Sequence, residues 1–242
     1  MRLERWARTS QMELEVVDGA LHVTDERGSR VFSQLEEVPR DLEVPPFELP
    51  DAPQLDEETV EFVRLELRDR KDEDQRVRAG ARGGQISQEA RAKMMAVDQA
   101  NTEFLSGLIR EVGWIDVERF GVEASNDAFL LVQHSGDKRL MRTALEAMRI
   151  DVQAGRMGGQ GYALLFDRLQ LDLGYLQRYG SQLSTLPTGE TVLMPCEDLS
   201  KVDERRSSMG MGSLEEYLGY FREEGDPPIR SLAEALASPE RH

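Results

Sequence analysis

The sequence predicts a mainly α-helical fold: a compact multi-helix domain with a small N-terminal β-hairpin or meander and a short hairpin near residues 183–194. Three observations predict this class. From residue 56 onward, apolar residues recur at helical spacing in successive segments. In the first 40 residues they alternate with polar residues around turn signals, as they do in strands. Residues 161–173 are apolar around most of a helix circumference, which is typical of a helix packed on several sides.

The N-terminal part is expected to contain two or three antiparallel strands. Asp18-Gly19 is a tight-turn signal between apolar residues in alternation, and a second turn is expected at 25–28. Residues that follow are rich in proline and acidic side chains, which predicts a linker or an extended arm. The expected organisation is a β appendage at 1–40, this arm at 41–54 and a helical core domain at 55–242.

Cap residues mark where the predicted helices begin. An aspartate or a serine can accept hydrogen bonds from the first turn of a helix. The helices predicted in this way are 56–78 with Asp56, 87–112 with Ser87 and 138–153 with Asp137. A further helix at 122–133 ends in Gln133 and His134. Short helices are expected at 200–208 and 213–224 and after Ser231, two of them opened by capping boxes, Ser213 with Glu216 and Ser231 with Glu234.

The apolar helix carries two charged residues in its middle, Asp167 and Arg168. Charged groups there lose hydration and need partners, and helical neighbours point roughly 100° apart, so the two are expected to contact different elements. They form either two structural ion pairs or the floor of a polar pocket. Gly174 is the expected end of the helix. A polar cluster suited to orienting a ligand follows it: Gln177, Tyr179 and Gln182.

Charge and composition exclude several classes of protein. The formal net charge of −16 argues against a nucleic-acid surface and against docking on anionic lipid, and it fits a basic protein partner or simple solubility equally well. No apolar run approaches the roughly 18 residues of a membrane span, and the N-terminus lacks the apolar core of a signal peptide. A cytoplasmic location is therefore expected. The single cysteine, Cys196, excludes a disulfide framework and is expected to be an inert thiol.

Several segments in the middle of the chain, in this order, resemble an uncharacterised bacterial family, the domain of unknown function 6624. The segments are DQRVR (74–78), DQANTEFL (98–105), VGW (112–114), LLVQH (130–134), ALLFDR (163–168), Q-R-YGSQ (177–182), VDERR (202–206) and GSLEEYL (212–218). The resemblance covers about residues 65–218 and leaves the N-terminal part outside. It marks candidate positions, and it implies no mechanism.

His134 is the main candidate for proton transfer near neutral pH. The chain has 3 histidines, and the other two lie in the predicted hairpin and at the C-terminus. A histidine at the end of an apolar helix is either a structural hydrogen-bonding group or an acid–base catalyst, and both interpretations stay open.

Three further polar residues could face the same space. Asp74 and Arg78 stand four residues apart on one helix face, either as a solvated pair or as part of a pocket in which Arg78 holds an anion. Asn101 interrupts the apolar stripe of its helix. One histidine with Asp74, Asp98 or Asp167 could supply mixed metal ligands, but no two histidines have ligand spacing, so neither a metal nor another cofactor is expected.

The favoured hypothesis is a small bacterial enzyme of unknown reaction with a metal-independent polar pocket. Its catalytic residues would be His134, Asp167 and Tyr179. Its ligand-binding residues would be Arg168, Gln133, Gln177, Gln182, Arg78, Asp74 and Asn101. The ligand would be a small molecule or a peptide. The alternatives are a non-catalytic binding or regulatory protein, which would meet a basic partner, and an accessory or tailoring protein that acts on a peptide.

Overall fold

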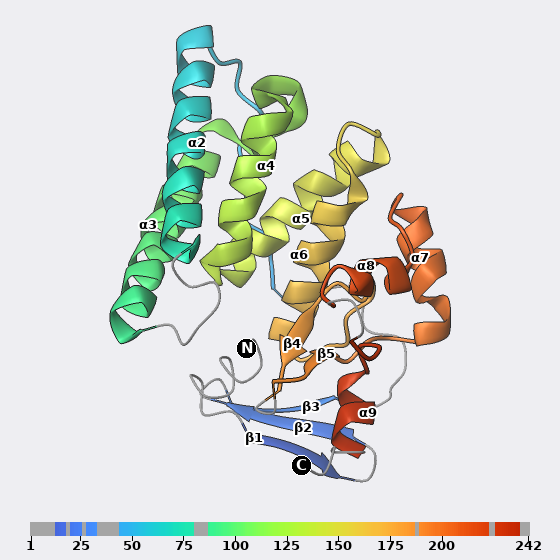
Figure 1. Cartoon of the computed structure of the whole chain (residues 1–242). Coiled ribbons are helices and arrows are strands. Elements are labelled where there is room, and N and C mark those ends of the chain that lie inside the picture. Colours follow the sequence, from blue (N-terminus) through green and yellow to red (C-terminus); the bar gives the residue numbers. More distant parts are fainter. Residues whose placement is uncertain are drawn as a thin grey trace. The chain divides into compact units, whose positions relative to one another are not determined.

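The structure, a computed structural model, describes residues 13–17, 20–25, 28–32, 44–79, 87–186, 189–222 and 226–237. These residues are mainly helical, as predicted (Figure 1). The chain divides into two compact units, Leu42–Gly158 and Met1–Asp41 together with Gly159–His242. The division falls in the glycine-rich segment before the apolar helix. Folding of residues 55–242 as one domain stays a prediction.

The N-terminal strands form the predicted meander. β1 (Glu13–Val17), β2 (Ala20–Asp25) and β3 (Gly28–Phe32) pair antiparallel in this order. Leu14 stands opposite Val23, and Val23 opposite Arg30. The turn residues 18–19 and 26–27 lie outside the described residues.

The proline-rich arm is described from residue 44, without helix or strand, and it is anchored on the first unit. The Phe47 N–H donates to Thr143 Oγ1 at 2.8 Å. The Phe47 ring lies 4.5 Å from the Arg110 guanidinium and 4.6 Å from that of Arg139, distances at which cation–π attraction operates.

The four helices described in the first unit are α2 (Glu57–Ala79), α3 (Gln88–Val112), α4 (Val117–Ser135) and α5 (Lys138–Gln153). Three of them, α2, α3 and α5, begin at the predicted caps. The first-turn N–H groups donate to Asp56, Ser87 and Asp137. α2 packs against both α3 and α4. Apolar residues that are fully buried on these four helices include Leu67, Leu105, Ile109, Leu131, Leu140 and Met148.

α4 begins earlier than predicted. Asp116 caps it, and one helical turn precedes a kink at Gly121, whose φ of 81° is rarely adopted by other residues. The predicted helix began only at residue 122, after this kink.

In the second unit, every residue from Gly161 to Leu186 is buried or half-buried, which agrees with a helix packed on several sides. The elements of this unit are α6 (Gly159–Asp172), β4 (Leu183–Thr185), β5 (Thr191–Leu193), η1 (Leu199–Lys201), α7 (Val202–Ser208), α8 (Leu214–Gly219) and α9 (Leu232–Ala237). Gly174, with φ 86°, ends α6 as predicted, and the Tyr175 N–H closes the turn on the Gln170 carbonyl. The predicted hairpin is β4–β5, although 187–188 of its turn lie outside the described residues. α8 ends before the predicted residue 224.

Gly159 allows α6 to start against the end of α7. A Cβ at this position would overlap the Met209 carbonyl oxygen, a backbone atom that cannot move aside. We expect Gly159→Ala to lower the free energy of unfolding by about 1–3 kcal/mol, measured by urea denaturation. Gly158→Ala is the matched control because a Cβ there meets nothing within 4 Å. Equal effects of the two substitutions would contradict the predicted close packing.

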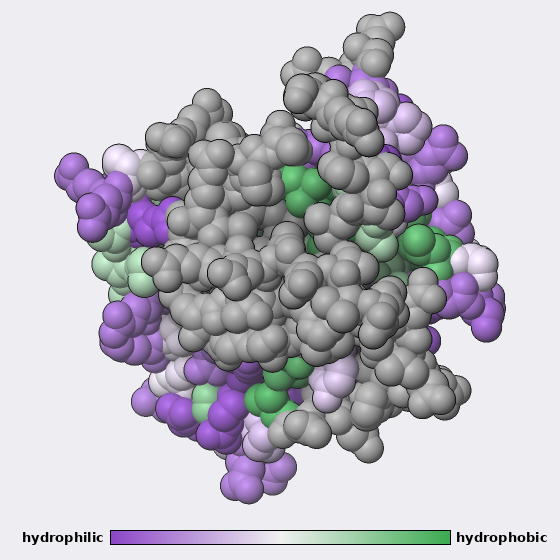
Figure 2. Space-filling view, turned by 90° about the horizontal axis from the view of Figure 1, so that it is seen from below, coloured by the Kyte–Doolittle hydropathy of each residue, from purple (hydrophilic) through white to green (hydrophobic). Residues whose placement is uncertain are grey.

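The described helices include none that is both long and apolar enough to cross a membrane. On the face shown in Figure 2, hydrophilic residues cover much of the coloured surface, and apolar residues form several separate areas. Large exposed apolar side chains include Tyr220 and Met95, in different units. Scattered apolar residues are normal on protein surfaces and identify no interface.

Candidate active site

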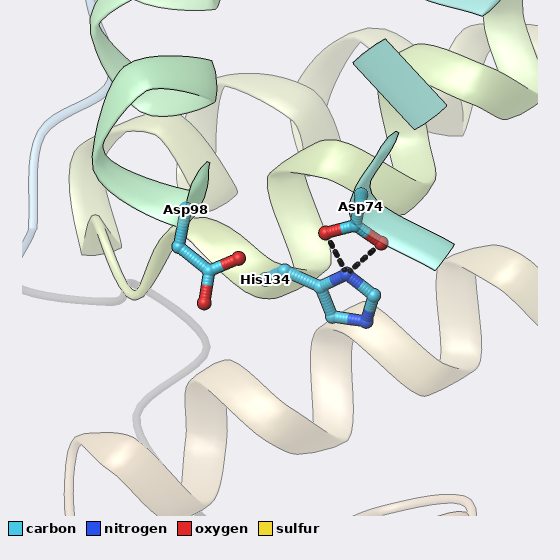
Figure 3. A group of neighbouring side chains, drawn as sticks. All are labelled: Asp74, Asp98 and His134. Atoms are coloured by element: carbon cyan, nitrogen blue, oxygen red, sulfur yellow. Dashed lines mark hydrogen bonds and ion pairs between the residues drawn. The ribbon is translucent and has the colours of Figure 1, made fainter. Parts of the chain in front are cut away.

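Three helices of the first unit bring a histidine and two aspartates together (Figure 3). Asp74 lies on α2, Asp98 on α3 and His134 in the last turn of α4. Their nearest side-chain nitrogen and oxygen atoms lie within 4.8 Å of one another. The packing of α2 against α3 and α4 produces this cluster from residues up to 60 positions apart.

His134 and Asp74 form a directly bonded pair. His134 Nδ1 lies 3.0 Å from both Asp74 Oδ1 and Asp74 Oδ2. An ionised carboxylate only accepts hydrogen bonds, so this contact assigns the proton of the neutral imidazole to Nδ1. Nε2 lies on the other side of the ring (Figure 3) and has no hydrogen-bond partner among the described residues. The Asp74 side chain is 0% exposed and that of His134 is 21% exposed.

Arg78 bridges the two aspartates. Its Nη1 lies 3.1 Å from Asp74 Oδ1, and its Nη2 donates to Asp98 Oδ1 at 2.6 Å. Gln75 Nε2 also donates to Asp74 Oδ2 at 2.9 Å. Two carboxylates and one guanidinium leave the cluster with one net negative charge while His134 is neutral. Arg78 is thus the shared counter-ion of the two acids, and its predicted role as an anion-binding group stays a prediction.

The two carboxyl groups are shifted in opposite directions. Burial raises the pKa of Asp74, but the hydrogen bond from His134 and the charges of His134 and Arg78 outweigh it, so the pKa lies below its ordinary value. Burial dominates at Asp98 and raises its pKa against the opposing effect of Arg78. Groups with pKa values shifted by burial and by specific charged partners are more frequent at functional sites than elsewhere.

Asn101 lies one helical turn beyond Asp98 on the same face of α3. It is 4% exposed, and its Oδ1 accepts a hydrogen bond from Arg70 Nη1 at 3.4 Å. Asn101 Nδ2 has no hydrogen-bond partner among the described residues. A buried amide donor without a partner is costly, so this position has a donor available for another group.

Asp74, Asp98 and His134 have the ligand types that a transition metal accepts. The positive guanidinium of Arg78, however, contacts both carboxylates. A metal ion bound by both acids would have to displace it, because the two cations would repel each other. The geometry therefore supports a proton-transfer site better than a metal site.

Asp167, in the second unit, binds the backbone of a turn. The Arg178 N–H donates to its Oδ1 at 2.7 Å, the Tyr179 N–H to Oδ1 at 3.0 Å, and the Ser181 N–H to Oδ2 at 2.9 Å. Burial raises the pKa of Asp167, and the hydrogen bonds from Ser181, Arg178 and Tyr179 oppose that shift. The carboxylate bonded to the His134 imidazole is that of Asp74. A catalytic role for Asp167 stays a prediction.

Gln177 and Gln182 also make internal hydrogen bonds. Gln177 Nε2 donates to the carbonyl groups of Gln182 and Met194, and its Oε1 accepts from the Gln182 N–H. Gln182 Nε2 donates to the Leu164 carbonyl, and Arg168 Nε lies 3.5 Å from Gln182 Oε1. These contacts tie the turn to its neighbours. Ligand binding by the two glutamines and by Arg168 stays a prediction, as does that by Gln133, which is half-buried beside His134.

Two contacts hold Tyr179 in place. Its ring meets the Phe166 ring edge-on with centroids 5.8 Å apart, and its carbonyl accepts a hydrogen bond from Arg206 Nη1 at 2.9 Å. Burial raises the pKa of the Tyr179 hydroxyl, which makes it a weaker acid. A catalytic role for Tyr179 stays a prediction.

The predicted site residues thus divide into two groups. Asp74, Arg78 and His134 come together in one unit, whereas Asp167, Gln177, Tyr179 and Gln182 come together in the other. One pocket shared by both groups stays a prediction. The sequence interpretation considered Asp98 only as a metal ligand, and it missed the roles of Gln75 and Arg206. Asp98 precedes Asn101 by three positions in one helix, a spacing that could have marked the pair as neighbours.

Cys196 lies outside both groups and is expected to react slowly. Burial raises the pKa of its thiol to about 12, so little thiolate is present at neutral pH. We expect slow alkylation by iodoacetamide in the native protein and fast alkylation in urea, measured by mass spectrometry. Equally fast alkylation in both conditions would show that the thiol is accessible and activated.

Fold and site together define a mainly helical protein with a buried carboxylate–histidine pair at the junction of three helices. The chain belongs to the family of unknown function DUF6624, whose family model matches residues 62–225. This match confirms the resemblance inferred from the sequence segments. Comparison with curated proteins and with solved structures finds no match.

Proposed function

We propose that this protein is an enzyme in which His134 is the general acid–base group and Asp74 orients it. One observation carries the proposal: both oxygens of a fully buried carboxylate lie 3.0 Å from His134 Nδ1, while Nε2 has no hydrogen-bond partner among the described residues. A carboxylate on one imidazole nitrogen fixes the tautomer and leaves the other nitrogen to accept protons. We keep the sequence-based expectation of a cytoplasmic bacterial protein, which rests on composition and family resemblance.

The chemistry follows from this arrangement. Nε2 accepts a proton from a bound water or substrate group, and Asp74 stabilises the imidazolium that forms. Arg78 and Gln75 hold Asp74 in position, so the carboxylate need not reorganise during the reaction. The protonated imidazole then returns its proton to the product. Such proton transfer contributes typically about 10²–10⁴-fold to a rate.

A non-catalytic role remains the alternative, in which the pair only ties α4 to α2. The net charge of −16 favours a basic partner for such a binding protein. A pull-down that retains a basic protein equally well with wild type and with His134→Gln, and that fails at high salt, would support this alternative.

The test of the proposal is the reactivity of His134. Diethylpyrocarbonate acylates unprotonated imidazole nitrogens, and we expect peptide mass spectrometry to show rapid modification of His134 in the wild-type protein. A screen for hydrolysis, elimination and isomerisation should then detect an activity that His134→Gln abolishes while the Tm stays within a few degrees. Asp127→Asn, on α4 beside Lys71, is the control, and it should keep the activity. An unreactive His134, or full activity in His134→Gln, would overturn the proposal.

A further inference from the structure

Two residues of α3 on the seam with α2, Asp98 and Asn101, have hydrogen-bonding atoms that no described residue uses. Arg78 meets Asp98 and Arg70 meets Asn101 across this seam. Asp74 stands between Arg70 and Arg78 at four-residue spacing on α2, so it and the bonded His134 lie between these two contacts. In this cluster, Asp98 Oδ2, Asn101 Nδ2 and His134 Nε2 have no hydrogen-bond partner among the described residues. Arg78 Nη1 lies 3.1 Å from Asp74 Oδ1 in an ion pair but also makes no hydrogen bond.

These atoms differ in what they offer a ligand. Asp98 Oδ2 accepts hydrogen bonds, and Asp98 is about one-fifth exposed. Asn101 Nδ2 donates hydrogen bonds and is buried, so it favours a ligand that brings an oxygen acceptor. Asp98 and Asn101 are neighbours on one helix face, with Cβ atoms roughly 5–6 Å apart as expected for this spacing. A group that donates on one side and accepts on the other fits this pair.

From this arrangement we propose that the site binds a neutral amide group of its substrate, which donates its N–H to Asp98 and accepts from Asn101 with its carbonyl oxygen. The proposal rests on the proposed function for the role of His134, which faces the same cluster and would act on the bound molecule. It adds the class of substrate: a carboxamide or peptide bond.

Charge favours a neutral amide over a carboxylate or an ammonium group as the ligand. A carboxylate ligand would satisfy Asn101, but it would face a cluster that already has one net negative charge, since Arg78 is shared by two acids. An ammonium ligand would satisfy Asp98, but it would place a donor beside the donor of Asn101. An amide supplies one donor and one acceptor without charge, so it satisfies both residues.

The experiment is an NMR titration of the full chain with three probes of equal size: propionamide, propionate and propylammonium. We expect saturable shifts of the Asn101 side-chain amide signals with propionamide and much smaller shifts with the two charged probes. Asn101→Leu removes the donor and keeps the shape, and it should weaken propionamide binding about fivefold to tenfold. Asp98→Leu should weaken it similarly. Asp127→Leu, in the same unit, is the matched control and should leave the affinity unchanged.

Tighter binding of either charged probe would overturn the proposal, as would the absence of Asn101 shifts up to the solubility limit of propionamide. Because the wild-type titration requires no substitution, a variant that fails to fold leaves this test intact. Modification of His134 by diethylpyrocarbonate is a separate readout. A reactive His134 with no amide binding would retain the proposed function and reject only the substrate class.

Discussion

Asp74→Asn is expected to lower the turnover number by about 10³–10⁴-fold, the scale of losing the carboxylate behind a catalytic histidine. An asparagine can present its NH₂ group to His134 Nδ1, which then becomes an acceptor and moves the imidazole proton to Nε2. Nε2 can no longer accept a proton in that tautomer. The substitution also removes the negative charge that stabilises the imidazolium. The measurement is kcat and kcat/KM on the substrate found in the screen.

The control for this prediction is Asp127→Asn, because Asp127 is also partly buried with a pKa raised by burial but lies beside Lys71 and not beside His134. Its kcat should stay within about twofold of wild type, since substitutions away from such contacts rarely change the free energy by more than about 0.5 kcal/mol. A nitrogen-15 spectrum of the imidazole gives an independent check. Nδ1 should carry the proton in the wild-type protein and lose it in Asp74→Asn. Unchanged turnover together with an unchanged tautomer would show that Asp74 is a structural partner only.

Asp167→Ala is expected to lower the free energy of unfolding by about 3–5 kcal/mol, because it leaves buried groups without their partner. The carboxylate accepts hydrogen bonds from three backbone N–H groups, those of Arg178, Tyr179 and Ser181. These three N–H groups are buried or partly buried. A water molecule could therefore replace the lost carboxylate only if the turn rearranged. Urea denaturation, followed by circular dichroism, measures the change.

Glu204→Gln removes a negative charge from an exposed position on α7 in the same unit, so it controls for net charge. It should change the free energy of unfolding by less than about 0.5 kcal/mol. If Asp167→Ala instead folds with wild-type stability and loses only activity, Asp167 belongs to the chemistry, as the sequence interpretation held. A large loss of stability would assign it to the scaffold of the 178–181 turn.

Local signals were sufficient for most of the fold. The helices after Asp56, Ser87 and Asp137 begin where the sequence places a cap, because capping depends on residues within one turn. The kink at Gly121 was harder to predict. A glycine interrupts the helical period whether the chain bends once or leaves the helix altogether, and only the packing around it decides between the two.

The sequence predicted which residues belong to the site better than it predicted which of them contact one another. His134, Asp74 and Arg78 were all candidates, yet their bond depends on how α2, α3 and α4 pack, and the sequence separations of 20 to 60 residues hide this. Asp167 shows the opposite difficulty. A carboxylate in an apolar helix indicates a buried hydrogen-bond acceptor. The sequence pattern does not show whether backbone amides or a ligand donate the hydrogen bonds to it.

The guanidinium of Arg78, which touches both aspartates, has a consequence for how the site handles protons. When one of the two aspartates gains a proton, its attraction to Arg78 weakens and the attraction between Arg78 and the other aspartate strengthens. Protonation of one acid therefore changes the electrostatic environment of the other. Titration of the two aspartates is thus a collective property, and an ionisation constant observed in kinetics would describe the pair instead of either carboxyl group.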